Sequence, residues 1–287
     1  MSAALISAVE TALHARVVQS APMAVGFGLT GLQADLADGR SIAVKAGAPE
    51  RADQLELEAY MLRELARLSD LPVPQVLHAG AELLVMSWID NDGAPITADV
   101  ERNAAELLAA LHAEPREAFG YGRDTVIGPL AQPNRAADEW VPFFREHRLL
   151  HMAETARLAG ALPVDMHARI GRLAHDLDRF LTEPRHPALI HGDLWTGNVL
   201  VRGRRIAGFV DPAIYVAHPE IELAFTTMFN TFGRPFFDAY EALAPLEPGF
   251  HEVRRELYNL YPTLVHVRLF GAGYLDPIDR TLRQLGF

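Results

Sequence analysis

The sequence predicts an α+β protein of two lobes, a small N-terminal lobe made of a β-sheet and one helix and a larger, mainly helical C-terminal lobe. Apolar and polar residues alternate on both sides of Asp38-Gly39, a pair that is typical of hairpin turns. From residue 99 onward, apolar residues recur mainly at helical spacing. Residues 91–97 between these regions are polar and contain Gly and Pro, which is typical of a linker.

The first lobe is expected to span residues 1–89. Residues 1–18 predict an amphipathic helix, because apolar residues recur at every fourth position, and they lack the basic start of a signal peptide. Residues 24–45 predict a glycine-rich turn followed by two strands. Residues 54–68 predict a helix that a proline-containing segment ends, and residues 83–86 predict a buried strand.

The second lobe is expected to span residues 90–287 and to be mostly helical, because its apolar residues share helix faces. Helices are predicted at 99–112, 140–157, 164–181 and 220–232, and from 251 to the glycine-containing segment at 271–274.

Composition restricts the possible functions. The 26 basic and 37 acidic residues give a net charge of −11, which disfavours binding to nucleic acid or to an anionic membrane. The chain has no cysteine, which excludes disulfides, thiolate metal sites and cysteine redox control. No segment has the roughly 18 consecutive apolar residues of a membrane span. We therefore expect a cytoplasmic protein.

The most informative segment is residues 191–198, which read HGDLWTGN and precede an Asp-Pro-Ala tripeptide at Asp211. Phosphoryl transfer needs a group that orients or deprotonates the acceptor hydroxyl, and hard oxygen ligands for Mg²⁺. Asp193 is the expected base. Asn198, spaced from it as in the kinase catalytic loop, and Asp211, which follows an apolar strand, are the expected magnesium ligands. Taken singly they could be turn residues, but the fixed spacing favours a kinase.

A second pair of charged residues fits the same chemistry. Lys45 ends the second predicted strand, and Glu58 lies on the helix that follows. In kinases a strand lysine holds the α- and β-phosphates of ATP and is fixed by a glutamate of the next helix. Isolated, the two residues would be solvated surface charges that contribute little. The kinase-like segment downstream favours the functional interpretation.

Two further segments are candidates for nucleotide binding. Residues 26–31 fit the pattern G-x-G-x-x-G ahead of a hairpin, so Gly26 and Gly28 could cover phosphates, although a flexible turn explains them equally well. The backbone of residues 87–89, Ser87, Trp88 and Ile89, could meet the adenine edge, with Met86 beside the ring. Met86 and Trp88 could equally be core residues.

Residues 191–198 resemble the HGDLW-x-GN signature of fructosamine and ketosamine kinases, which belong to the aminoglycoside-phosphotransferase-like branch of the protein-kinase-like fold. The similarity covers most of the chain, at residues 138–144, 211–215, 218–224, 228–233, 248–250, 258–261 and 270–274. It implies ATP and Mg²⁺ as cofactors and phosphorylation of the 3-hydroxyl of a ketosamine. The phosphorylated adduct comes apart and restores the amine, so the implied role is deglycation of small-molecule ketosamines or of glycated protein lysines.

The resemblance also suggests supporting roles. Trp195 is expected to form a wall of the sugar site, although a tryptophan can also be a core residue. His191 and Glu222 are expected to support the catalytic loop. The glycine loop matches the family only loosely, so Gly26 and Gly28 are weaker assignments than Asp193. The cysteine that controls a redox-linked dimer in some members is absent.

Two other functions stay open at this point: another small-molecule kinase of the aminoglycoside or choline type, and a nucleotide-binding module without turnover. The sequence does not decide between ribulose- and fructose-derived substrates, or between free amino acids and protein lysines. It leaves the oligomeric state open, with a monomer slightly favoured.

Overall fold

The computed structural model describes residues 3–48 and 52–287, which divide into two compact units. The first unit comprises residues 1–100 and 197–213, and the second comprises residues 101–196 and 214–287. Residues 197–213 belong to the first unit because their hairpin bonds to it: the Asp92 N–H donates to the Val201 carbonyl, and the Phe209 N–H donates to the Pro72 carbonyl. The lobe boundary expected after residue 89 remains a prediction.

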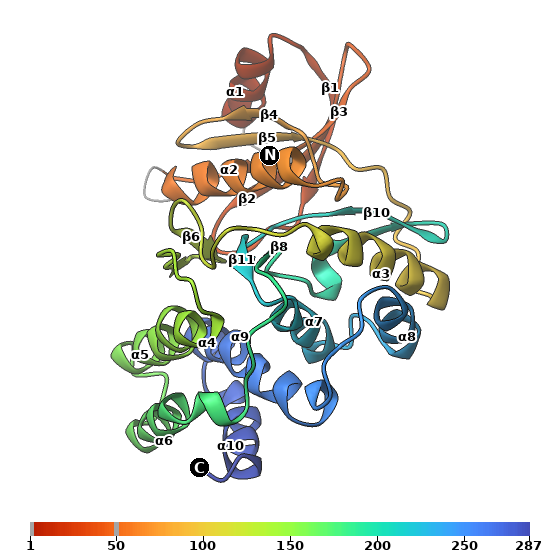
Figure 1. Cartoon of the computed structure of the whole chain (residues 1–287). Coiled ribbons are helices and arrows are strands. Elements are labelled where there is room, and N and C mark those ends of the chain that lie inside the picture. Colours follow the sequence, from red (N-terminus) through yellow and green to blue (C-terminus); the bar gives the residue numbers. More distant parts are fainter. Residues whose placement is uncertain (1–2, 49–51) are drawn as a thin grey trace. The chain divides into compact units, whose positions relative to one another are not determined.

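The first unit is built on an antiparallel sheet. Within the described residues, five strands lie in the order β1-β2-β3-β5-β4 (Figure 1). Their bounds are Val17–Met23 for β1, Thr30–Leu36 for β2, Ser41–Ala46 for β3, Val76–Ala79 for β4 and Leu83–Ser87 for β5. Helices α1 (Ala3–Leu13) and α2 (Ala52–Leu68) and the hairpin of β9 (Val199–Arg202) and β10 (Arg205–Phe209) complete the unit.

Alternation along β3 gives the sheet two buried faces. Ile42 and Val44 pack in a cluster that includes Val9 of α1, whereas Ala43 packs against α2. Side chains of a strand point alternately to opposite faces, so Lys45 shares the α2 face with Ala43. This alternation determines what Lys45 can reach.

The second unit is mainly helical, and α9 is its central helix, in contact with α5, α7 and α10 (Figure 1). Its long helices are α3 (Ala98–Ala113), α5 (His151–Leu158), α6 (Val164–His175), α7 (Pro219–Met228), α8 (Arg234–Leu243), α9 (Arg255–Phe270) and α10 (Leu275–Gln284). A short helix α4 (Trp140–Phe144) continues into α5 through a π-helical segment, Arg145–Leu150. Two-strand pairs join β6 (Thr125–Ile127) to β7 (Leu130–Gln132) and β8 (Ala188–Ile190) to β11 (Tyr215–Ala217).

Most predicted elements are confirmed, and the differences have local causes. The helix expected over residues 1–18, whose first two residues lie outside the described ones, ends at Leu13, because Val17 begins β1 and pairs with β2. The helix expected to reach residue 232 ends at Met228, where Asn230 takes a left-handed φ of 52°. The helix expected to reach residue 181 ends at His175. Helices α8 and α10 were not predicted, and neither were strands β1, β4, β6, β7, β8, β9 and β11.

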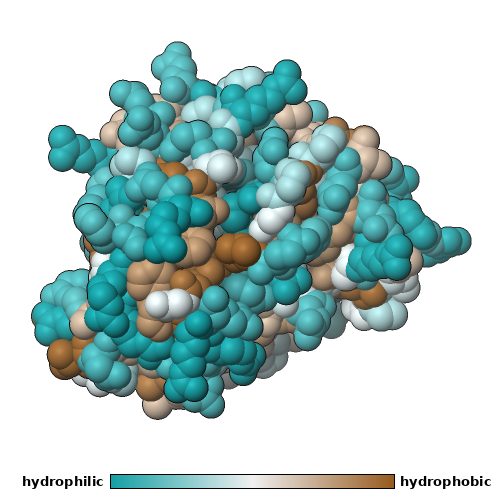
Figure 2. Space-filling model, turned by 60° about the horizontal axis from the view of Figure 1, so that its bottom comes forward, coloured by the Kyte–Doolittle hydropathy of each residue, from teal (hydrophilic) through white to brown (hydrophobic). Residues whose placement is uncertain are grey.

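The face turned forward in Figure 2 is mostly hydrophilic, with smaller hydrophobic areas. None of the helices in the described parts of the chain is long and apolar enough to cross a bilayer.

Candidate active site

Lys45 and Glu58 form a buried ion pair in the first unit. The Nζ atom of Lys45 lies 2.7 Å from Oε1 of Glu58, and each residue is 7% exposed. Glu58 shares a helix stripe with Leu55 and Leu62, which pack on the sheet, so it faces the same side as Lys45. Strand alternation and helix periodicity thus bring the two charges together.

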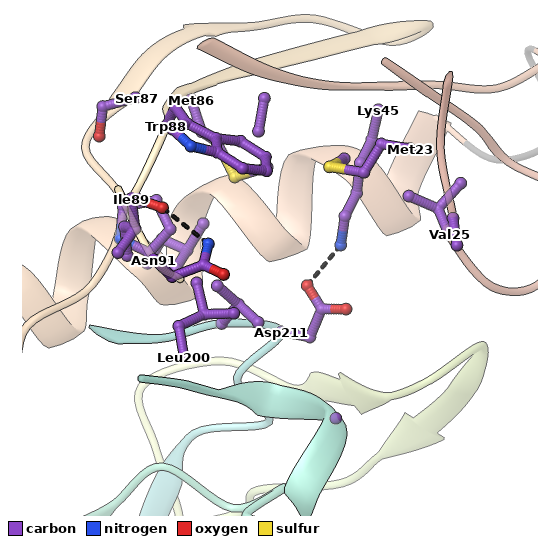
Figure 3. Close-up of a pocket in the computed structure, with 16 residues that line it drawn as sticks. Met23, Val25, Lys45, Met86, Ser87, Trp88, Ile89, Asn91, Leu200 and Asp211 are labelled. Atoms are coloured by element: carbon purple, nitrogen blue, oxygen red, sulfur yellow. Dashed lines mark hydrogen bonds and ion pairs between the residues drawn. The ribbon is translucent and has the colours of Figure 1, made fainter. Parts of the chain in front are cut away.

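Asp211 is the second partner of the same lysine. Its Oδ1 atom lies 2.5 Å from Lys45 Nζ, and its side chain is 47% exposed (Figure 3). It lies two positions after the end of β10 and has a left-handed φ of 54°. An Asp tolerates this conformation better than a bulky residue does, and the abrupt turn lets the carboxylate leave the strand.

Asn198 is held beside Asp211 by the β9–β10 hairpin. The Val210 N–H donates to the Asn198 carbonyl over 3.1 Å, and the Asn198 side-chain amide donates to the Asp211 carbonyl over a long 3.5 Å. The hairpin therefore places an amide and a carboxylate on adjacent turns. Both offer hard oxygen atoms, which suit Mg²⁺.

Charges around Lys45 perturb each other. Burial alone would lower the pKa of Lys45, but the carboxylates of Glu58 and Asp211 outweigh it and raise that pKa above its usual range. Burial raises the pKa of Glu58 to about 7, Lys45 opposes this rise, and the nearby Asp211 carboxylate adds to it. Lys45 is therefore firmly cationic, as a ligand for phosphate must be.

A cavity of about 280 Å³ opens beside this ion pair, within the first unit. The residues expected at the adenine ring, Met86, Ser87, Trp88 and Ile89, all line it, as do Lys45 and Asp211 (Figure 3). The cavity wall is therefore apolar at the end formed by β5 and charged at the end formed by Lys45.

Two backbone donors of residues 87–89 are already used by the sheet. The Ser87 N–H donates to the Gln75 carbonyl, and the Trp88 N–H donates to the Ser41 carbonyl. The Ile89 carbonyl accepts from the Asn91 side chain over 3.0 Å (Figure 3). Within the described residues, the Trp88 carbonyl and the Ile89 N–H form no main-chain hydrogen bond.

The glycine loop is only partly associated with the cavity. Val25 lines it, but Gly26 and Gly28 do not. The third glycine of the pattern, Gly31, has a packing reason, since a Cβ there would lie 2.2 Å from the Met23 carbonyl oxygen. Gly31 thus serves the close pairing of β1 with β2, which the motif alone does not reveal.

The segment with the expected base belongs to the second unit, between β8 and β11. His191 is fully buried, and its Nδ1 accepts from the Asp193 N–H over 3.3 Å. Gly192 has φ 85°, and its N–H donates to Glu222 Oε1 over 2.7 Å. Glu222 and His191 thus fix the backbone immediately before Asp193.

Trp195 lies two positions after Asp193 and is 40% exposed. Its ring meets the ring of Phe229 edge to face, with 5.9 Å between the centroids. Trp195 is therefore held by an aromatic neighbour while much of its surface is open to a ligand.

Sequence comparisons point to one family. A model of the fructosamine kinase family matches residues 9–286. A relative from Synechocystis sp. named "Probable ketoamine kinase" is 36% identical over 250 residues, which is 84% of this chain and 81% of the relative. A protein-ribulosamine 3-kinase of Arabidopsis thaliana, named chloroplastic, is 31% identical over 86% of this chain and 78% of its own. The chain belongs to the fructosamine kinase family.

Solved structures agree with this assignment. A crystal structure from Thermobifida fusca described as a "putative fructosamine-3-kinase" has a TM-score of 0.86 and 33% identity, over 99% of both chains. An aminoglycoside phosphotransferase in complex with ADP and hygromycin B has a TM-score of 0.71 and 16% identity, over 99% of both chains, and shows the fold alone. The predicted bilobal, protein-kinase-like α+β fold is confirmed. This member of the fructosamine kinase family is an enzyme, a phosphotransferase with an alcohol group as acceptor.

Sequence reasoning missed the residues that hold Glu222 in this fructosamine kinase. His112 and Tyr240 are buried, His112 Nε2 donates to Glu222 Oε2 over 2.7 Å, and His112 Nδ1 lies 2.9 Å from the Tyr240 hydroxyl. Both glutamate oxygens are thus engaged, one by the loop and one by His112. The partners are 110 and 128 positions apart along the chain, so no local pattern marks them.

Proposed function

We propose that this protein is an ATP-dependent kinase that phosphorylates the 3-hydroxyl of ketosamines and thereby promotes deglycation. The observation that carries the proposal is Lys45, which is held between the carboxylates of Glu58 and Asp211 at the wall of a cavity. Family membership supports the ketosamine acceptor, since relatives are named as ketoamine and ribulosamine kinases.

The nucleotide would bind in the cavity of the first unit. The Trp88 carbonyl would accept from the exocyclic amine of adenine, and the Ile89 N–H would donate to a ring nitrogen. Met86 and the Trp88 side chain would pack against the ring, because both line the apolar end of the cavity. Gly26 and Gly28 would cover the phosphates from the loop between β1 and β2.

The charged end of the cavity would hold the phosphates. Lys45 would leave Asp211 to bind the α- and β-phosphates, with Glu58 keeping its ammonium in place. Asp211 and Asn198 would then hold Mg²⁺, because their oxygen atoms are hard donors on adjacent turns. When bound, the ion would neutralise charge on the phosphates and on the transferring group.

Asp193 would orient and deprotonate the acceptor hydroxyl. As the hydroxyl oxygen forms its bond to the γ-phosphorus, the bond between that phosphorus and the β,γ-bridging oxygen breaks and ADP leaves. The hydroxyl proton passes to the Asp193 carboxylate. Trp195 would pack against the C–H face of the sugar. Glu222 and His191 would keep the Asp193 backbone in position.

Phosphorylation at the 3-hydroxyl would create a leaving group beside the ketosamine carbonyl. Loss of that phosphate from the sugar, followed by hydrolysis, releases the amine in its unmodified form. The natural substrates would be small ketosamines or glycated lysines of proteins.

The proposal is tested by ADP release with Mg-ATP against ribulosyl-lysine, fructosyl-lysine, kanamycin and choline, with Asp193→Asn as the blank. We expect turnover of at least one ketosamine that disappears in the blank, together with recovery of free lysine. Turnover of kanamycin or choline alone would overturn the ketosamine assignment and show that the protein is another kind of small-molecule kinase. Nucleotide binding without turnover of any acceptor would identify a silent binding module.

A further inference from the structure

The second unit contains a further cavity, of about 420 Å³, between the end of α7 and helices α9 and α10. Phe229 and Tyr274 form aromatic parts of its wall, and Arg255, Glu256 and Arg280 line it as charged residues. None of these residues belongs to the predicted catalytic set. Phosphoryl transfer as proposed above does not use them.

The cavity is connected to the catalytic loop through aromatic rings. Phe229, which lines the cavity, contacts the Trp195 ring at 5.9 Å between centroids. The ring of His266 follows, at 5.1 Å from Phe229 and 5.0 Å from Tyr274. A sugar packed on Trp195 would lie beside Phe229, and a substituent that extends past the Phe229 ring would enter the cavity that Phe229 lines. In a ketosamine that substituent is the amine component.

The charged residues of the cavity are arranged as a cation beside an ion pair. Arg255 is paired with Glu256 at 2.9 Å. Arg280 is exposed and forms no ion pair or hydrogen bond with any residue in the part of the chain that the structure describes. Arg255 and Arg280 also line an adjoining cavity of about 460 Å³. The three side chains carry a net charge of +1 in a chain whose net charge is −11.

A buried polar group adds to the polar wall. Asn259 is 9% exposed and lines the cavity, and its side-chain amide donates to the Thr227 hydroxyl over 3.2 Å. Its Oδ1 atom has no hydrogen-bond partner among the described residues. A buried acceptor without a partner is unfavourable, and a donor on a ligand would satisfy it.

We propose that this cavity binds the amine component of the ketosamine and selects an amine that carries a free carboxylate, that is, a glycated free amino acid. Arg280 would bind the carboxylate through charge-assisted hydrogen bonds, and Glu256 would accept from the protonated secondary amine. A glycated lysine inside a protein has no carboxylate at this place. This inference rests on the proposed ketosamine kinase activity.

The test compares two substrates that differ only in the charged group, ribulosyl-glycine and ribulosyl-glycinamide. We expect kcat/KM for the acid to exceed that for the amide about tenfold or more, the usual effect of one charge-assisted hydrogen bond. Arg280→Gln should lower kcat/KM for the acid by about the same factor and leave the amide unchanged. Arg283→Gln is the matched control, because Arg283 is exposed, pairs with Asp279 at 2.8 Å and lines neither cavity.

Equal kcat/KM values for the two substrates, with no effect of Arg280→Gln, would overturn the inference and leave the proposed function intact. If neither substrate is phosphorylated, ADP release with ribulosyl-lysine and fructosyl-lysine shows separately whether the proposed function holds. In that case, the affinity for ribulosyl-glycine, measured by calorimetry, tests the role of the cavity without turnover. Weaker binding to Arg280→Gln than to Arg283→Gln supports the inference, and equal binding overturns it.

Discussion

The Nζ atom of Lys45 lies 2.5 Å from Oδ1 of Asp211, although the two residues are 166 positions apart. Lys45 is the last but one residue of β3 and Asp211 follows β10, so this contact ties the hairpin of residues 197–213 to the five-stranded sheet. Asp211 is also the carboxylate that we propose as a metal ligand. If Mg-ATP binds as proposed, Lys45 exchanges its contact with Asp211 for one with the phosphates and keeps its contact with Glu58.

This exchange predicts an order of effects for the lysine and its glutamate. Lys45→Met removes the phosphate ligand, and we expect kcat/KM for ATP to fall about 10²–10³-fold, as for other preorganised charges. Glu58→Gln should have a smaller effect, because a glutamine oxygen can still accept from Lys45. Steady-state kinetics with saturating ketosamine measures both. Equal losses in the two variants would contradict the view that Glu58 acts only by positioning Lys45.

Asp211 and Asp193 should differ in their contribution to turnover. Loss of a general base costs about 10²–10⁴-fold, with the lower end expected for a loose phosphoryl-transfer transition state. A metal ligand acts directly on the charge of the transferring group, so Asp211→Ala should lower kcat at least as much as Asp193→Ala. Single-turnover rates at saturating Mg-ATP decide the order. An Asp211→Ala enzyme about tenfold more active than Asp193→Ala would reverse it.

The N-terminal half of the site could be predicted from sequence because it depends on local periodicity. Lys45 and Glu58 follow from strand alternation and from one helix stripe, both visible in the residues themselves. Strand β1 could not be predicted, because its side chains do not alternate between buried and exposed positions. Its extended conformation depends on pairing with β2. Its Val17 also happens to continue the four-residue apolar period of the preceding helix.

Contacts between distant positions mark the limit of the sequence interpretation. Two such contacts have no recognisable spacing in the sequence. One is the support of Glu222 by His112 and Tyr240, and the other is the packing of Ile89 over Gly208. The kinase-like residues were found because their chemistry restricts residue type at fixed intervals. Their neighbours need only the right shape or one acceptor, which many sequences can supply.

The close packing of Ile89 on Gly208 leads us to predict that a side chain at position 208 in β10 would disturb the adenine end of the cavity. A Cβ at this position would lie 2.3 Å from Ile89 Cδ1 and 3.2 Å from the Pro72 carbonyl oxygen. Gly208→Ala must therefore displace Ile89, and we expect KM for ATP to rise and the free energy of unfolding to fall by about 1–3 kcal/mol. Gly122→Ala is the control, because nothing lies within 4 Å of a Cβ there and Gly122 does not line the cavity. Unchanged ATP affinity in Gly208→Ala would refute this prediction.

His218 predicts how stability depends on pH. The residue is 6% exposed at the start of α7, where its Nδ1 accepts from the Glu220 N–H over 3.1 Å. Burial lowers the pKa of His218 to about 3, and the charges of Arg254 and His112 act in the same direction. A neutral imidazole is thus part of the helix cap, and protonation would remove the acceptor.

The sign of the effect follows from the lowered pKa. The unfolded chain protonates this histidine near pH 6.5, whereas the folded protein keeps it neutral down to about pH 3. Its contribution is therefore fully present above pH 6.5 and is lost as the pH falls, by about 2 kcal/mol between pH 7 and pH 5. His218→Asn keeps a capping oxygen but does not titrate, so urea unfolding should show a shallower loss of stability over this interval. Parallel pH profiles of the variant and the parent would show that other groups control the acid sensitivity.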